Sequence, residues 1–99
     1  MESGYKILWT DHALKELDAA YGYLQENFTE KELHKLSIEI DRILNLISKN
    51  PTLFPISESQ KIRKVPVRKF NTIYYRERKN TIQILSFFLN RQNPDNKKI

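Results

Sequence analysis

Two neighbouring stretches of the chain place apolar residues at helical spacing. Apolar positions recur every three or four residues, which puts them on one side of a helix. The spacing predicts one helix from Thr10 or Asp11 to about Asn27, and a second from Thr29 to Asn50. The apolar positions are Leu14, Leu17, Tyr21, Leu24 and Phe28 in the first helix, and Leu33, Leu36, Ile40, Ile43, Leu44 and Ile47 in the second.

Local signals support these helix ends. Thr29 and Glu32 form the pattern of a capping box, in which each side chain accepts a hydrogen bond from a free backbone N–H. Phe28 and Leu33 stand where a hydrophobic staple would form across that cap. Pro51 ends the second helix, because the residue before a proline disfavours helical geometry. With about two residues between them, the helices should form an antiparallel hairpin.

Four shorter segments alternate apolar and polar residues and therefore predict strands, at residues 5–10, 62–68, 70–76 and from 81 onward. Pro66 lacks an amide hydrogen, which places its strand at a sheet edge or at a bulge. Residues 78–80 should make the hairpin turn. The side facing the helices is expected to hold Val65, Val67, Ile73, Tyr75, Ile82, Ile84 and Phe88. The opposite, open side is expected to hold Lys64, Arg68, Thr72, Tyr74, Arg76, Gln83 and Leu85.

The element order β-α-α-β-β-β predicts an α+β fold, with an antiparallel helix hairpin packed on one face of a small, mainly antiparallel sheet. A length of 99 residues fits a single domain covering residues 1–99, with a frayed tail at 94–99. The absence of cysteine excludes disulfides and thiol chemistry. No apolar run reaches the ~20 residues of a membrane span, and the first residues lack a signal-peptide pattern. We therefore expect a cytoplasmic protein.

Charge is divided unevenly along the chain. Residues 1–50 hold 6 Lys/Arg against 9 Asp/Glu, whereas residues 51–99 hold 11 against 3. The positive charge thus gathers on the predicted sheet, and arginine is the residue that best recognises carboxylates and phosphates. We interpret Lys64, Arg68, Arg76 and Arg91 as a basic face that binds the target of the protein.

The sequence gives little support for a metal site, a phosphate-binding loop or a cofactor. His12 and His34 lie on different predicted helices and have no cysteine or spaced carboxylates beside them, so a metal site is not expected. Gly4 and Gly22 are the only glycines, which excludes a glycine-rich phosphate loop. We expect no cofactor.

Taken in order, four segments resemble the RelE/ParE superfamily of type II toxin–antitoxin toxins. The opening YKILWTDHALKEL (residues 5–17) is similar to a family strand that leads into an Ala-Leu helix. NPTLFP (50–55) resembles the loop after the helices, and IRKVPVRKFNTIYYR (62–76) the central hairpin. IQILSFFLNR (82–91) resembles the last strand with its closing arginine. The resemblance covers nearly the whole chain and implies a cognate antitoxin as partner.

Two activities occur in that superfamily. RelE-like toxins cut messenger RNA on the ribosome with basic residues and often a C-terminal Tyr or His, whereas ParE-like toxins inhibit DNA gyrase. Lys64 and Arg91 match family basic positions, but the Arg of the following strand is replaced by Asn71. No Tyr follows Tyr75 and no His follows His34. RNA cleavage needs positioned proton donors and acceptors, so these absences favour the ParE-like activity.

Three hypotheses follow for the function. A ParE-like toxin acting on DNA gyrase without catalysis comes first. A RelE-like ribonuclease comes second, with Lys64, Tyr74 and Arg91 as its catalytic group and Tyr75 as the other candidate phenol. A diverged, non-toxic module that only binds a partner comes third. Under none of the three hypotheses does the sequence indicate which residues contact the antitoxin.

Overall fold

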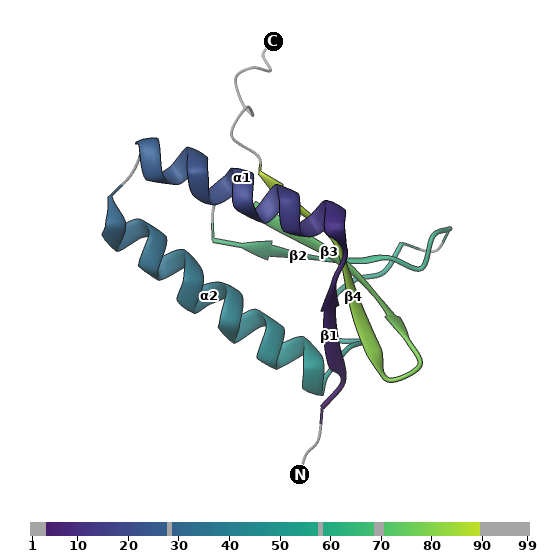
Figure 1. Ribbon diagram of the computed structural model, residues 1–99. Coiled ribbons are helices and arrows are strands. Elements are labelled where there is room, and N and C mark those ends of the chain that lie inside the picture. The colour runs from purple at the N-terminus through teal and green to yellow at the C-terminus, as the bar shows by residue number, and fades with distance from the viewer. Residues whose placement is uncertain (1–3, 28, 58, 69–70, 90–99) are drawn as a thin grey trace.

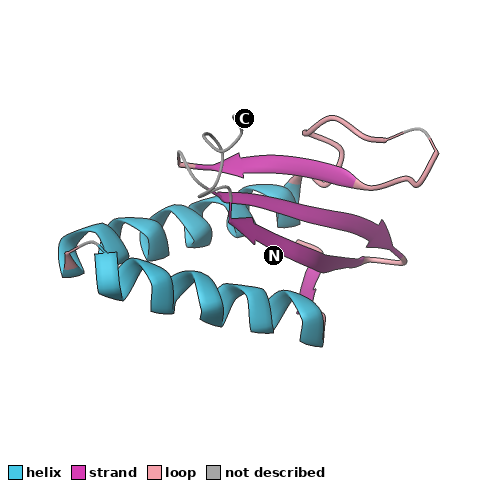
Figure 2. Cartoon of the chain, turned by 90° about the horizontal axis from the view of Figure 1, so that it is seen from above, coloured by secondary structure: helices cyan, strands magenta, loops and turns pink. Residues whose placement is uncertain are grey.

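The computed structural model describes residues 4–27, 29–57, 59–68 and 71–89 as two helices lying on one face of a four-stranded sheet (Figures 1 and 2). The strand order is β1-β4-β3-β2; β1 runs parallel to β4, and the other pairs are antiparallel. The predicted α+β fold and element order are confirmed. The elements are β1 (Lys6–Trp9), α1 (Asp11–Asn27), α2 (Glu30–Lys49), β2 (Arg63–Val67), β3 (Asn71–Arg78) and β4 (Thr81–Leu89).

Helix α1 packs on β4 through a narrower apolar surface than its sequence predicts. Its buried residues are Ala13, Ala20 and Leu24, so small side chains let the helix backbone lie close to the sheet. Leu14, expected in the core, is 46% exposed. At the start of α1, the buried side of the helix is therefore centred on Ala13 and not on Leu14. Thr10 begins α1, because its hydroxyl accepts a hydrogen bond from the Ala13 amide at 3.2 Å.

Helix α2 buries the predicted apolar stripe and begins at the predicted cap. Leu36, Ile40, Ile43 and Ile47 are buried, which confirms the spacing. The Thr29 hydroxyl accepts a hydrogen bond from the Glu32 amide at 3.3 Å. The Glu32 carboxylate reaches across to Arg68, at 3.2 Å. The staple residue Phe28 lies outside the described residues. None of the described helices is long and apolar enough to cross a membrane.

The sheet also confirms two local predictions. Pro66 lies on β2, which is an edge strand of the sheet and therefore a position where proline is tolerated. Lys79 and Asn80 connect β3 to β4 and have φ angles of 43° and 63°. A two-residue turn with both φ angles positive matches the twist of the strands that it connects.

The prediction that Phe88 faces the helices is wrong, because β4 contains a bulge. Tyr74 pairs with Ser86 but Tyr75 pairs with Ile84, so Leu85 has no partner residue on β3. An extra residue reverses the alternation of side chains beyond it. Phe87 is therefore buried, at 1% exposure, whereas Phe88 is 45% exposed.

Candidate functional site

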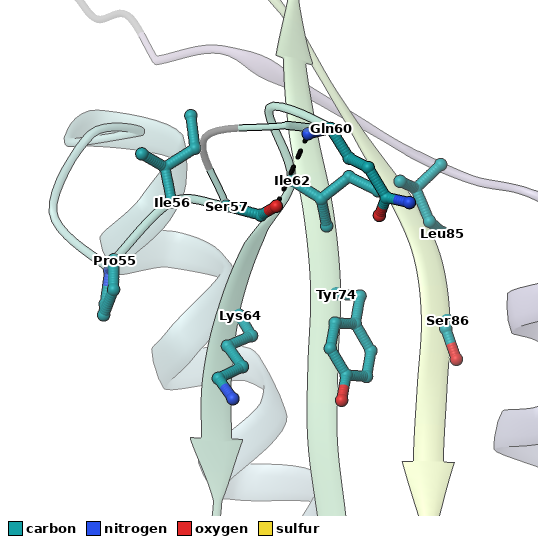
Figure 3. Close-up of a pocket in the computed structure, with 9 residues that line it drawn as sticks. All are labelled: Pro55, Ile56, Ser57, Gln60, Ile62, Lys64, Tyr74, Leu85 and Ser86. Carbon is teal, nitrogen blue, oxygen red and sulfur yellow. Dashed lines mark hydrogen bonds between the residues drawn. The ribbon is translucent and has the colours of Figure 1, made fainter.

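A groove of about 530 Å³ lies on the open face of the sheet, opposite the helices (Figure 3). One wall is the loop that connects α2 to β2, and the floor is made by outward-facing side chains of β2, β3 and β4. Most of the described lining is apolar, and it includes one aromatic ring and one charged group. It consists of Pro55, Ile56, Ser57, Gln60, Ile62, Lys64, Tyr74, Leu85 and Ser86.

Lys64 and Tyr74 lie side by side on the floor of this groove. They are direct partners in the antiparallel β2–β3 pairing, so their side chains leave the sheet on the same face. Figure 3 shows the two side chains extending in parallel. A smaller hollow of about 270 Å³ shares both residues and Pro55, and continues over Pro66 and Thr72. The lysine therefore stands between two recesses of the same face.

The β4 bulge shapes the opposite side of the groove. It places two consecutive residues, Leu85 and Ser86, in the lining, which a regular strand would not do. Glu16 of α1 stabilises this irregular segment, because one carboxylate oxygen accepts hydrogen bonds from the Ser86 hydroxyl at 2.5 Å and the Phe87 amide at 2.9 Å. His12 lies 3.3 Å from the same oxygen.

The base of the loop is bound to the sheet through its carbonyl oxygens. The Tyr75 hydroxyl donates to the Pro51 carbonyl at 3.0 Å. The Arg63 guanidinium donates to the Phe54 carbonyl at 2.8 Å and to the Thr52 carbonyl at 3.4 Å. Further along, the Ser57 and Ile62 segments meet through an amide–carbonyl bond of 2.7 Å. These bonds fix the loop in the position that forms the wall of the groove.

Tyr75, one of the two candidate phenols, faces away from this groove. Its side chain is fully buried on the helix side, and burial raises the pKa of its hydroxyl. A buried phenol that holds a backbone carbonyl cannot reach a substrate on the opposite face. Tyr75 is therefore a structural residue, and Tyr74 is the phenol that the described part of the chain presents in the groove.

The three described residues of the predicted basic face do not all lie on one surface. Lys64 and Arg76 are on the open face, and the Arg76 guanidinium is hydrogen-bonded to Gln83 at 2.8 Å. Arg68, expected on the same face, instead pairs with Glu32 of α2 at 3.2 Å. Its φ angle of 56° turns the chain at the end of β2, which breaks the strand alternation and directs the guanidinium toward the helices. Arg91 lies outside the described residues.

Asn71, which stands where the superfamily has an arginine, contributes nothing to the groove. It shares the helix-facing side with Ile73 and is 3% exposed. Its amide nitrogen has no hydrogen-bond partner within the described part of the chain. Across residues 4–27, 29–57, 59–68 and 71–89, no group of three or more His, Cys, Asp or Glu side chains could hold a metal ion.

Sequence reasoning missed the residues that make this surface a groove. Pro55 and Ile56 belong to a segment that the sequence predicts only as a connection, and Ile62 stands at the start of a predicted strand with no groove expected beside it. The position of Arg63 could have indicated the loop. Strand alternation places it on the same side of the sheet as the inward-facing Val65, where its charge needs a hydrogen-bond partner.

Comparison with known proteins adds a structural relative. A solved structure described as "Chromosomal ParDE TA system from P. aeruginosa" superposes with a TM-score of 0.71 over 86% of this chain and 95% of that one. The chain shares its fold with that structure. The two sequences are 20% identical, so the likeness establishes a common fold and leaves activity to be argued from the site. No family model and no curated protein matches the chain.

Proposed function

We propose that this chain is the toxin of a type II toxin–antitoxin pair, held inactive by a cognate antitoxin. Two observations support the proposal. The chain shares its fold with a structure whose description names a ParDE toxin–antitoxin system. The open sheet face offers Lys64 and Arg76, and none of the described residues that line either recess is a carboxylate, which suits an acidic partner.

The proposed target is DNA gyrase, inhibited by binding and not by catalysis. The observation that carries this choice is the position of Tyr75, buried and bound to the Pro51 carbonyl. Cleavage of RNA requires one group to remove the 2′-hydroxyl proton and another to protonate the leaving oxygen. With Tyr75 excluded, the described groove offers one phenol and one ammonium for both steps. A gyrase inhibitor needs neither, because it acts by binding one state of its target more tightly than another.

Two assays of the purified protein test this choice of target. We expect loss of gyrase supercoiling activity with accumulation of linear DNA, and no codon-spaced cuts by primer extension on translated messenger RNA. Arg76→Ala should weaken the gyrase effect, whereas Lys35→Ala, on an exposed part of α2, serves as the matched control. Normal supercoiling at high protein concentration would contradict gyrase as the target.

A specific observation also favours a second candidate, the ribosome-dependent ribonuclease. Lys64 and Tyr74 are adjacent, and a lysine beside a phenol is an arrangement that could stabilise a phosphate and exchange a proton. If this candidate is correct, primer extension shows cuts that disappear in Tyr74→Phe, while gyrase supercoiling is unaffected. That pair of results would replace the gyrase proposal and make Lys64 and Tyr74 catalytic.

A further inference from the structure

The residues that line the groove on the open face restrict its ligand more than the net charge of the protein alone does. Its lining is largely aliphatic, with Pro55, Ile56, Ile62 and Leu85 around the ring of Tyr74. An apolar recess of this kind favours an apolar side chain, since burial of carbon surface supplies the free energy. Lys64 is the single charged group among the nine lining residues. It marks the position of one negative charge beside the apolar group.

We propose that this groove binds a segment of a partner protein that places one apolar side chain next to one carboxylate. The apolar group lies between the Ile56–Ile62 wall and Leu85, and the carboxylate meets the Lys64 ammonium beside Tyr74. This ligand is the chemical group that a protein partner would present to the groove under the proposed function. The proposal rests on that function for its biological setting, but the binding itself can be measured without toxicity.

The charge distribution favours a protein segment over RNA. Nucleic-acid binding draws most of its affinity from several cations that neutralise successive phosphates. Among the described residues that line the two recesses, Lys64 is the one cation, and the nearby Arg76 is hydrogen-bonded to Gln83. Arg68, which could have extended the row, is paired with Glu32 on the helix side. One cation in an apolar setting matches a single carboxylate.

Arg63 and Tyr75 act as positioning residues for this groove. Neither lines it, yet their hydrogen bonds to the carbonyls of Pro51, Thr52 and Phe54 hold the loop that forms its wall. A wall fixed before binding reduces the ordering that a ligand must otherwise impose. Loosening the loop should therefore weaken every ligand of the groove by the same factor, whatever the charge of that ligand.

Binding of two small probes tests the proposal. N-acetyl-L-phenylalanine carries the apolar ring and the carboxylate, and its amide carries the ring alone. In a methyl NMR titration we expect millimolar binding, on the order that such small ligands reach, with shifts at Ile56, Ile62 and Leu85. The acid should bind about two- to fivefold more tightly than the amide, the range typical of a partly exposed ion pair.

Variants separate the two parts of the argument. Lys64→Met should bring the acid to the affinity of the amide, while Lys61→Met, an exposed neighbour outside the lining, should leave the ratio unchanged. Tyr75→Phe and Arg63→Lys should weaken both probes equally and preserve the ratio. A merely destabilised fold would instead shift methyl signals throughout the core.

Three outcomes would overturn the proposal. These are equal binding of acid and amide to the wild-type protein, shifts confined to other surfaces, and displacement of both probes by uridine 5′-monophosphate at lower concentration. The last would identify a nucleotide site. None of these results depends on growth inhibition or on gyrase, so failure here is distinguishable from failure of the proposed function.

Discussion

The bulge in β4 predicts that two adjacent phenylalanines contribute very differently to the stability of the fold. Phe87 is 1% exposed on the helix side, whereas Phe88 is 45% exposed on the open side. Removing a buried phenylalanine ring costs about 3–5 kcal/mol, from lost transfer energy and the remaining cavity. A half-exposed ring that leaves no cavity costs about 0.5–1 kcal/mol. Phe87→Ala should therefore lower the free energy of unfolding several times more than Phe88→Ala.

Urea unfolding measures the free energy of unfolding of both variants, and the fluorescence of a tryptophan beside Phe87 reports on that site. Trp9 is the only tryptophan, and its ring centre lies 6.5 Å from that of Phe87. Fluorescence therefore follows this contact while circular dichroism follows the whole fold. A loss of this size is a large part of the stability of a small domain, so Phe87→Leu replaces the alanine variant if that one does not fold. Equal losses, or a greater loss from Phe88→Ala, would refute the bulge register.

Two further predictions concern bonds that hold the fold. Tyr75→Phe should lower stability at neutral pH by about 1–3 kcal/mol, because it leaves the buried Pro51 carbonyl without its donor. Burial holds the folded-state pKa of Tyr75 above its unfolded value. The stability that this group contributes is therefore intact below about pH 10 and is lost as pH rises toward the folded pKa. Melting temperatures measured from pH 9 to 11 should fall more steeply for the wild type than for Tyr75→Phe. Thr29→Ala should cost about 1 kcal/mol by removing the α2 cap, and Thr29→Ser should restore most of it.

Much of the fold follows from local patterns in the sequence. The α2 stripe, the Thr29 cap, the edge position of Pro66 and the turn at Lys79 and Asn80 each depend on a few neighbouring residues. Spacing and backbone preference are sufficient to predict features of that kind.

Two of the errors share a different cause, since both involve a contact distant in sequence. The bulge at Leu85 is stabilised by Glu16, 70 residues from Ser86, and alternation alone gives no sign of it. Arg68 turns toward Glu32, 36 residues away.

The candidate site was predictable only in part, for the same reason. Lys64 and Tyr74 were correctly placed on the open face by strand alternation. The groove around them depends on the path of the α2–β2 loop, which hydrogen bonds from Arg63 and Tyr75 determine. A loop of this length carries no periodic signal, so its folding over the sheet becomes visible only in three dimensions.

Growth of cells that express this chain alone, compared with cells that also express the adjacent reading frame, tests the central claim most directly. A toxin should stop growth when induced alone, and co-expression of its antitoxin should restore growth and yield a stable complex of the two proteins. Glu39→Ala, on α2 and away from the groove, should remain toxic and serve as a folded control. Unimpaired growth with abundant folded protein and no partner complex would contradict the account.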